Sequence, residues 1–185
     1  LPSITNVGTL NVTAKAENKN YKDVTVEYKL KVTRKAVTVK ADNKSKVFGE
    51  KDPELTATVE GTLGKDTVEY TLSRKAGEDV GTYPITASGK AEQGNYSVTY
   101  ATGTLTITKA ETMTLTPELT GKNAEKVYDS KPLSGGAKAT VTEGTTITYS
   151  TDGGKTWSEE LPSITNVGTL NVTAKAENKN YKDVT

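Results

Sequence analysis

The sequence contains no cysteine and no histidine. Without cysteine there are no disulfides, thiol nucleophiles or thiolate metal sites, and without histidine there is no imidazole ligand and no imidazole general base. The domains must therefore be stable without disulfide cross-links. We expect no catalytic residues, no metal site and no cofactor.

An excess of one charge and long apolar runs are also missing. The 24 basic and 23 acidic residues leave a net charge of +1, which disfavours binding to nucleic acid or to an anionic membrane by bulk electrostatics. No apolar run is long enough to cross a bilayer. We expect no nucleic-acid partner and no membrane contact by this chain.

The sequence does contain an identical repeat. Residues 1–25, LPSITNVGTLNVTAKAENKNYKDVT, recur letter for letter as residues 161–185, which gives a period of 161 − 1 = 160 residues. A fixed long period indicates a repeat array. A unit of this length accommodates one large domain or two small ones.

A weaker repeat lies inside the 160-residue unit. Residues 7–35 and 80–109 share a Val-Gly-Thr motif, an Asn-Tyr motif and a final alternating strand that ends in a basic residue. Two related domains therefore alternate. We predict that residues 1–35 are the C-terminal part of one β domain, that residues 37–110 are a complete domain, and that residues 111–185 are the N-terminal part of the next domain of the first type.

The strand signal is strong and no helical period is evident. Segments such as 67–72 (TVEYTL) and 103–108 (GTLTIT) alternate apolar residues with threonine or charge, and Gly, Asn and Asp separate them. About six short strands in some 75 residues indicate small immunoglobulin-like β-sandwich domains, arranged in an extended array. A β-grasp sheet with one short helix is the alternative.

Two motifs carry a resemblance to a known family. The run KVFGEKDPEL (46–55), followed by GEDVGTYPITAS, GNY and GTLTITKA, resembles the MBG domain of the YGX type. The run KVYDSKPL (126–133), with TYSTDGGKTW, NVGTLNV and NYKD, is similar to its YDG-type relative. Phe48 replaces the family tyrosine and Ser130 the family glycine. The resemblance implies tandem stalk or adhesive repeats of large bacterial extracellular proteins, located at the cell surface or cell wall.

Residues 150–157 resemble the Asp-box, S-x-D-x-G-x-T-W, of bacterial sialidases and other secreted carbohydrate-active proteins. We interpret it as a structural hairpin turn with a tryptophan packed beneath it; the alternative is a glycan contact through Trp157 and Tyr149. A sialidase requires an arginine cluster, and the sequence has only Arg34 and Arg74. The motif positions are Ser150, Asp152, Gly154, Thr156 and Trp157.

The sequence leaves two ways of stabilising the domains undecided, a calcium site and an isopeptide bond. Adjacent carboxylates such as Glu159 and Glu160 have neither the spacing of a calcium loop nor the arrangement of a glycosidase pair, so we interpret them as solvated turn charges, with a calcium site as the alternative. Lysine and asparagine are abundant, and a Lys–Asn isopeptide bond would replace the missing disulfides.

No nucleophile with a neighbouring base and no phosphate-binding loop is present, so we expect no enzyme. The expected function is that of a stalk or spacer repeat of a bacterial surface or secreted adhesin; the alternative is an adhesive module that binds host glycan, mucin or matrix protein. The second copy stops at Thr185, without the strand that residues 26–33 (VEYKLKVT) supply to the first. Because an unpaired strand edge promotes association, we predict that neighbouring repeats complete one another head to tail by strand addition, or that the sequence is a window on a longer array.

Overall fold

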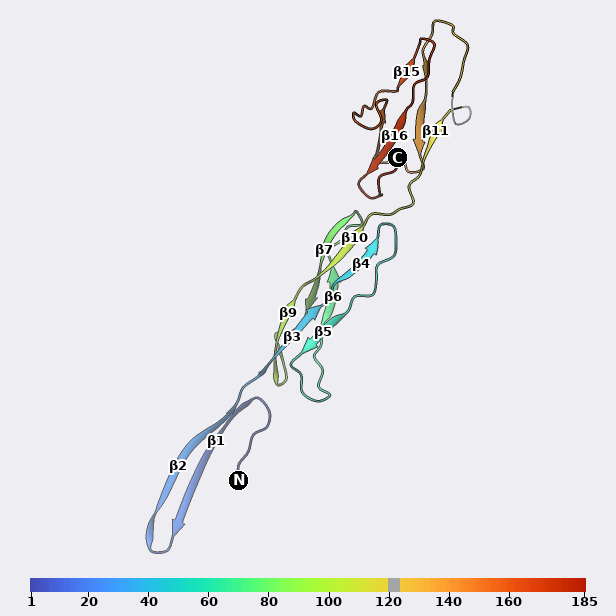
Figure 1. Ribbon diagram of the computed structural model, residues 1–185. Helices are drawn as coiled ribbons and strands as arrows, with labels where there is room; N and C mark the ends of the chain where they lie inside the picture. Colours follow the sequence, from blue (N-terminus) through green and yellow to red (C-terminus); the bar gives the residue numbers. More distant parts are fainter. Residues whose placement is uncertain (120–123) are drawn as a thin grey trace. The chain divides into compact units, whose positions relative to one another are not determined.

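The computed structural model describes residues 1–119 and 124–185, which form sixteen β-strands and no helix (Figure 1). The all-β class predicted from the alternating Thr, Val and Ile residues is thereby confirmed, and the sheets are consistent with a β-sandwich domain. The β-grasp alternative requires a helix, and these described residues contain none. Correspondingly, they include no helix that is long and apolar enough to span a membrane.

The chain divides into two compact units, which we describe separately. Both units draw on residues 37–110, and the domain boundaries drawn from the sequence stay predictions. Unit 1 consists of residues 1–44, 53–76 and 83–105, and unit 2 consists of residues 45–52, 77–82 and 106–185.

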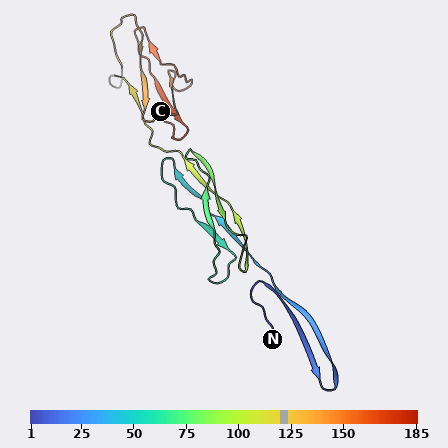
Figure 2. The same ribbon diagram turned by 180° about the vertical axis from the view of Figure 1, so that it is seen from behind.

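Unit 1 begins with a long antiparallel hairpin of β1 (Gly8–Asn18) and β2 (Tyr21–Val32). The pairing runs from Gly8 opposite Val32 to Asn18 opposite Tyr21, with one irregularity between Ala16 and Asn18. The sheet has only these two strands, and both views of the ribbon show them as a two-stranded ladder (Figures 1 and 2). In the part of the chain that the structure describes, no third strand pairs with this hairpin.

Residues 35–110, which we call the central segment, contain two four-stranded sheets. Their strand orders are β5-β3-β9-β8 and β4-β10-β7-β6. β3 pairs with β9 in parallel and with β5 antiparallel, and β7 pairs antiparallel with β6. The strand bounds are β3 (Lys35–Ala41), β4 (Lys44–Val47), β5 (Ala57–Glu60), β6 (Thr71–Arg74), β7 (Gly81–Ser88), β8 (Glu92–Gln93), β9 (Tyr96–Ala101) and β10 (Gly103–Thr108).

The core of unit 1 follows from the two-residue period of its strands. Along β3, Val37, Val39 and Ala41 are buried, whereas the intervening residues are exposed. Ile85 of β7 and Leu105 of β10 are completely buried. Burial of these apolar side chains is the main favourable contribution to the folding free energy of the unit. The unit contains no disulfide bond that could add to it.

Unit 2 is built from shorter strands in three two-stranded sheets, β11-β13, β12-β15 and β14-β16. Its small core is formed by Met113, Ala139 and Ala176, with Leu115, Val141, Ile147, Tyr181 and Val184 packed around them. The strand bounds are β11 (Leu115–Glu118), β12 (Leu133–Ser134), β13 (Gly136–Ala139), β14 (Thr145–Ser150), β15 (Ser163–Ile164) and β16 (Thr173–Asn178).

The two identical 25-residue copies begin the same hairpin but extend it differently. Ala16 is opposite Val24 in the first copy, and Ala176 forms a bridge with Val184 in the second, so the register is preserved. In the first copy the strand continues back to Gly8, because residues 28–32 pair with residues 8–12. In the second copy, the corresponding residues 168–172 form no strand.

Candidate functional site

The first candidate site, which we name the first junction, connects residues 1–35 to the central segment within unit 1. The Asn95 side chain is its centre: Oδ1 accepts the Val7 N–H at 2.8 Å, and Nδ2 donates to Asn6 Oδ1 at 3.0 Å. The Asn95 carbonyl accepts the Lys35 N–H at 2.9 Å, next to the parallel pairing of Lys35 with Tyr96. One asparagine thus binds the start of β1 and the start of β3.

The second junction connects the central segment to residues 111–185 within unit 2, and it repeats this arrangement. Asn180 Oδ1 accepts the Val80 N–H at 2.9 Å, and Asn180 Nδ2 donates to Asp79 Oδ1 at 2.9 Å. The Asn180 carbonyl accepts the Ala110 N–H at 3.0 Å, next to the parallel bridge between Ala110 and Tyr181.

The two junctions therefore share three hydrogen bonds at equivalent positions. The Val-Gly-Thr and Asn-Tyr motifs, which the sequence offered only as landmarks of the weaker repeat, contact each other at both junctions. In each case an asparagine side chain satisfies a backbone N–H that would otherwise need water, and each such bond contributes roughly 1 kcal/mol net. The recurrence of an asparagine before tyrosine was the signal available in the sequence.

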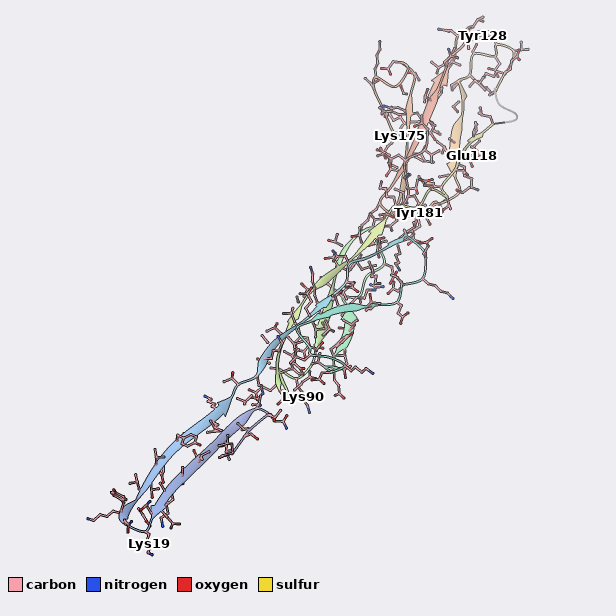
Figure 3. The ribbon with its side chains drawn as sticks, turned by 60° about the horizontal axis from the view of Figure 1, so that its bottom comes forward. Lys19, Lys90, Glu118, Tyr128, Lys175 and Tyr181 are labelled. Atoms are coloured by element: carbon pink, nitrogen blue, oxygen red, sulfur yellow. The ribbon has the colours of Figure 1, made fainter. Side chains whose placement is uncertain are left out.

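The second junction differs from the first in charge and in aromatic packing. Asp79 replaces Asn6, and Lys179 forms an ion pair with it at 2.7 Å. The hydrogen bond from Lys179, followed by that from Asn180, lowers the pKa of Asp79 below its usual range. Tyr181, marked in Figure 3, meets Phe48 edge to face, with the ring centroids 5.4 Å apart. Phe48 belongs to the KVFGEKDPEL motif, so this motif contributes directly to the junction.

A buried lysine organises the same motif. Lys46 has a side chain only 4% exposed, and its Nζ donates to Asp52 Oδ1 at 2.8 Å, to Glu78 Oε2 at 2.5 Å and to the Glu50 carbonyl at 3.1 Å. Hydrogen bonds from the ammonium to Asp52 and then Glu78 raise the pKa of Lys46. The amine is therefore held as a cation between carboxylates, which is a structural ion pair rather than the neutral nucleophile that isopeptide formation requires.

The KVYDSKPL motif has a related turn in unit 2. Lys126 Nζ donates to Asp129 Oδ1 and to the Lys131 carbonyl, both at 2.6 Å, much as Lys46 binds a carboxylate and a loop carbonyl. Ser130 has a φ of +65°, a left-handed conformation that favours glycine. A glycine, which the resemblance to the YDG type implies at this position, would adopt this conformation without strain.

The Asp-box-like residues come together as a turn between Tyr149 and Ser158, whose backbones pair on either side of it. Asp152 Oδ1 accepts the N–H groups of Lys155 at 2.9 Å and Thr156 at 3.0 Å, and Oδ2 accepts the Thr156 hydroxyl at 2.7 Å. These bonds hold the pKa of Asp152 far below its usual range, the Thr156 backbone N–H having the largest effect. Ser150 Oγ, which is buried, accepts the N–H of Gly154 at 2.8 Å.

The two aromatic residues of this region differ in accessibility. Tyr149 is 9% exposed and its hydroxyl accepts the Ala137 N–H at 3.2 Å, so little of its ring is available to a ligand. Trp157 is 38% exposed, and its indole N–H donates to the Gly154 carbonyl at 3.1 Å. A glycan contact stays a prediction for Trp157.

The comparison with protein families concerns the central segment. Residues 37–106 match the family model of the MBG domain (YGX type). This segment is a YGX-type MBG domain. A search of curated proteins finds no significant match to the chain.

The YGX-type MBG domain contains the Lys46 cluster, Phe48 and Asn95, so it contributes residues to both junctions. MBG domains occur in surface and secreted proteins, and they are a structural repeat family rather than an enzyme family. The YDG-type resemblance of the flanking residues stays a prediction. Among residues 1–119 and 124–185, no three acidic side chains gather into a group that could hold a metal ion.

Proposed function

We propose that this chain is a stalk or spacer repeat of a bacterial cell-surface or secreted adhesin, without catalytic activity, which holds a binding region away from the cell. The recurrence of the same three hydrogen bonds at two successive junctions is the observation that carries this proposal. A stalk requires that each domain be held to the next in a defined way, and the junctions supply such a connection.

The chemistry of the junctions supports a stiff connection. Each asparagine side chain binds two groups of the preceding segment. The backbone carbonyl of Asn95 accepts the N–H of Lys35 at the start of β3, and that of Asn180 accepts the N–H of Ala110. Two side-chain bonds and an adjoining parallel strand pair restrict rotation more than a flexible linker of the same length does. Domains added through such junctions extend an array instead of folding back on it.

The 160-residue repeat provides the length. If each domain contributes 8–10 strand residues at roughly 3.4 Å per residue, it adds on the order of 30 Å, and each two-domain unit adds on the order of 60 Å. Identical copies also favour recombination between repeats, which would vary the length of the stalk.

Small-angle X-ray scattering on proteins with one, two and three 160-residue units tests the proposal. We expect the maximum dimension to grow in proportion to the number of units. The matched variant carries Asn95→Ala and Asn180→Ala in every unit, and we expect its maximum dimension to grow less steeply. A compact particle whose size hardly depends on the number of units would contradict the stalk.

A second candidate is an adhesive module for host glycan, mucin or matrix protein, favoured by the exposure of Trp157 at the Asp-box-like turn. Binding of a two-domain unit to a glycan array or to mucin, with loss of binding in Trp157→Ala but not in Tyr149→Phe, would support this candidate. The Tyr149→Phe control keeps the ring and removes the hydroxyl that accepts the Ala137 N–H. Equal binding by the parent and the Trp157→Ala variant would exclude Trp157 as the contact.

A further inference from the structure

The two junctions differ in the residue that precedes each asparagine. In the first junction this residue is Gly94, and the neutral Asn6 accepts the hydrogen bond from the asparagine side chain. In the second junction it is Lys179, and the acidic Asp79 takes the position of Asn6. The same backbone bonds therefore connect uncharged residues at one junction and residues of opposite charge at the other.

Both oxygens of the Asp79 carboxylate are bound by the segment that follows it. Oδ1 accepts the Asn180 side-chain N–H at 2.9 Å, and Oδ2 accepts the Lys179 ammonium at 2.7 Å. Two neighbouring residues of one turn thus hold a single carboxylate. A turn with glycine at the first of these positions supplies the amide donor but not the ammonium, because glycine has no side chain.

A basic residue at the end of the preceding segment is common to both junctions. Arg34 pairs with Glu92 at 3.0 Å at the first junction, and Lys109 pairs with Asp183 at 3.4 Å at the second. Each basic residue directly precedes the residue whose N–H the asparagine carbonyl accepts. Because both junctions have this contact, it does not distinguish between the segments that follow.

The tyrosines that follow the two asparagines have different contacts. Tyr181 packs edge to face on Phe48 of the YGX-type domain. Tyr96, at the equivalent position of the first junction, is only 5% exposed. Its hydroxyl donates to Asp66 Oδ2 at 2.5 Å and accepts the Leu63 N–H at 3.1 Å, both within its own segment. Tyr96 therefore offers little of its ring to an aromatic residue of a preceding domain.

We propose that Asp79 and Phe48 form a recognition surface of the YGX-type MBG domain, which favours a following segment with the sequence Lys-Asn-Tyr over one with Gly-Asn-Tyr. Residues 179–181 have the first sequence, and residues 94–96 of the YGX-type domain itself have the second. The domain therefore prefers a neighbour of the other type to a copy of itself, so the two types alternate. This inference concerns the order of the domains and does not require that the array be a stalk.

Both incorrect orders lose the ion pair. A YGX-type domain followed by a copy of itself would place Asp79 beside glycine, and residues 1–35 followed by a Lys-Asn-Tyr segment would place lysine beside the neutral Asn6. The asparagine bonds remain available in either case. The order is thus set by a difference in affinity, to which an exposed ion pair and an edge-to-face aromatic pair each contribute modestly.

Substitutions in the full chain reproduce each mismatch. Lys179→Gly gives the second junction the Gly-Asn-Tyr sequence, and Asp79→Asn gives it the neutral acceptor. We expect each to lower the hydrogen-exchange protection factor of the Val80 amide about two- to five-fold, without a change at Val7. The double variant Asp79→Asn/Lys179→Gly recreates the uncharged pairing of the first junction, so we expect it to lose no more protection than either single variant. Additive losses, or full protection in a single variant, would overturn the proposal.

Two further variants separate the charge from the glycine backbone. Lys179→Gln removes the ammonium without adding a glycine, and we expect it to lower Val80 protection as Lys179→Gly does. Lys19→Gly changes the identical residue of the first copy and should alter neither the Val80 nor the Val7 amide. Parent-like protection in Lys179→Gln would assign the effect to backbone flexibility and overturn the charge recognition.

The aromatic part of the surface is tested at Phe48 by the same measurement. We expect Phe48→Leu to lower the protection factor of the Val80 amide about two- to ten-fold, because it removes the edge-to-face contact with Tyr181. Phe48→Tyr keeps an aromatic ring and should retain the protection of the parent. Equal protection in the leucine and tyrosine variants would exclude Phe48 from the recognition surface.

Discussion

The two copies of residues 1–25 have the same sequence and different surroundings. In the first copy the apolar face of the hairpin is largely exposed, whereas in the second Ala176 lies in the core of unit 2 beside Met113 and Ala139. The Asn178 side chain likewise makes hydrogen bonds with Glu143, Thr145 and Asn180, whereas the Asn18 side chain makes only the equivalent of the last one, with Asn20. Burial of this segment is therefore decided by the elements that pack against it, because its own sequence is unchanged.

The largest expected effect on stability comes from truncating Met113, a side chain that packs against Ala176 in the second copy. Met113 is 2% exposed, and Met113→Ala leaves a cavity over Ala176. We expect a loss of about 2–4 kcal/mol in the unfolding free energy of unit 2. Hairpin resonances from residues 8–32 should keep their chemical shifts, and chemical denaturation followed by NMR measures both quantities. Equal destabilisation of the hairpin would contradict the conclusion that Met113 packs against the second copy alone.

Asn178 and Asn18 are the same residue in the two copies, one buried and the other exposed, so their substitutions can be compared directly. Asn178→Ala removes two donors to Glu143 and Thr145 inside unit 2, and we expect a loss of about 1–3 kcal/mol. Asn18→Ala removes an exposed side chain that accepts only the Asn20 N–H, and we expect a change within about 0.5 kcal/mol. Thermal melts of the two variants under the same conditions make the measurement. Similar losses at both positions would contradict the role assigned to burial.

The junction asparagine gives a smaller and more local effect. Asn180→Ala removes the acceptor of the Val80 N–H, and we expect faster hydrogen exchange at Val80 with little change at Val7. Asn95→Ala should do the reverse, because Asn95 binds Val7. Asn20→Ala, the same residue in the first copy, is the control and should alter neither amide.

The smallest effect is the pH response of the second junction. The pKa of Asp79 is lowered when folded, so its contribution is complete above the usual Asp pKa of about 3.9 and is lost as the pH falls through the lowered value. The Val80 amide resonance should therefore titrate below about pH 4. The Val7 resonance should not follow Asp79, because Asn6 occupies the equivalent position and does not ionise. Asp79→Asn should remove the titration at Val80.

Much of the fold could be predicted from the sequence. The alternation of Val, Ile and Thr with polar residues predicted strands, and the motif around Phe48 indicated the YGX-type MBG domain, which the family match confirms. The Asp-box-like spacing predicted a turn, because each defined position has a local partner within a few residues. Such signals are readable because their contacts are close in the sequence.

The junctions and the core of unit 2 could not be predicted in this way. Asn95 and Val7 are 88 residues apart, and Asn180 and Val80 are 100 residues apart, so no local pattern pairs them. The sequence marked these residues only as recurring landmarks. It also left a Lys–Asn isopeptide bond open as a stabilising cross-link, and the structure shows that Lys46 contacts the carboxylates of Asp52 and Glu78.

By itself, the sequence determined the all-β class, the 160-residue period and the register of the repeated hairpin, because side-chain alternation and turn residues act over a few positions. Only the tertiary structure decided that Ala176 is buried and Ala16 is exposed, since identical residues have identical local preferences. The difference comes from Met113, Ala139 and their neighbours, which remove one copy from water and leave the other in contact with it.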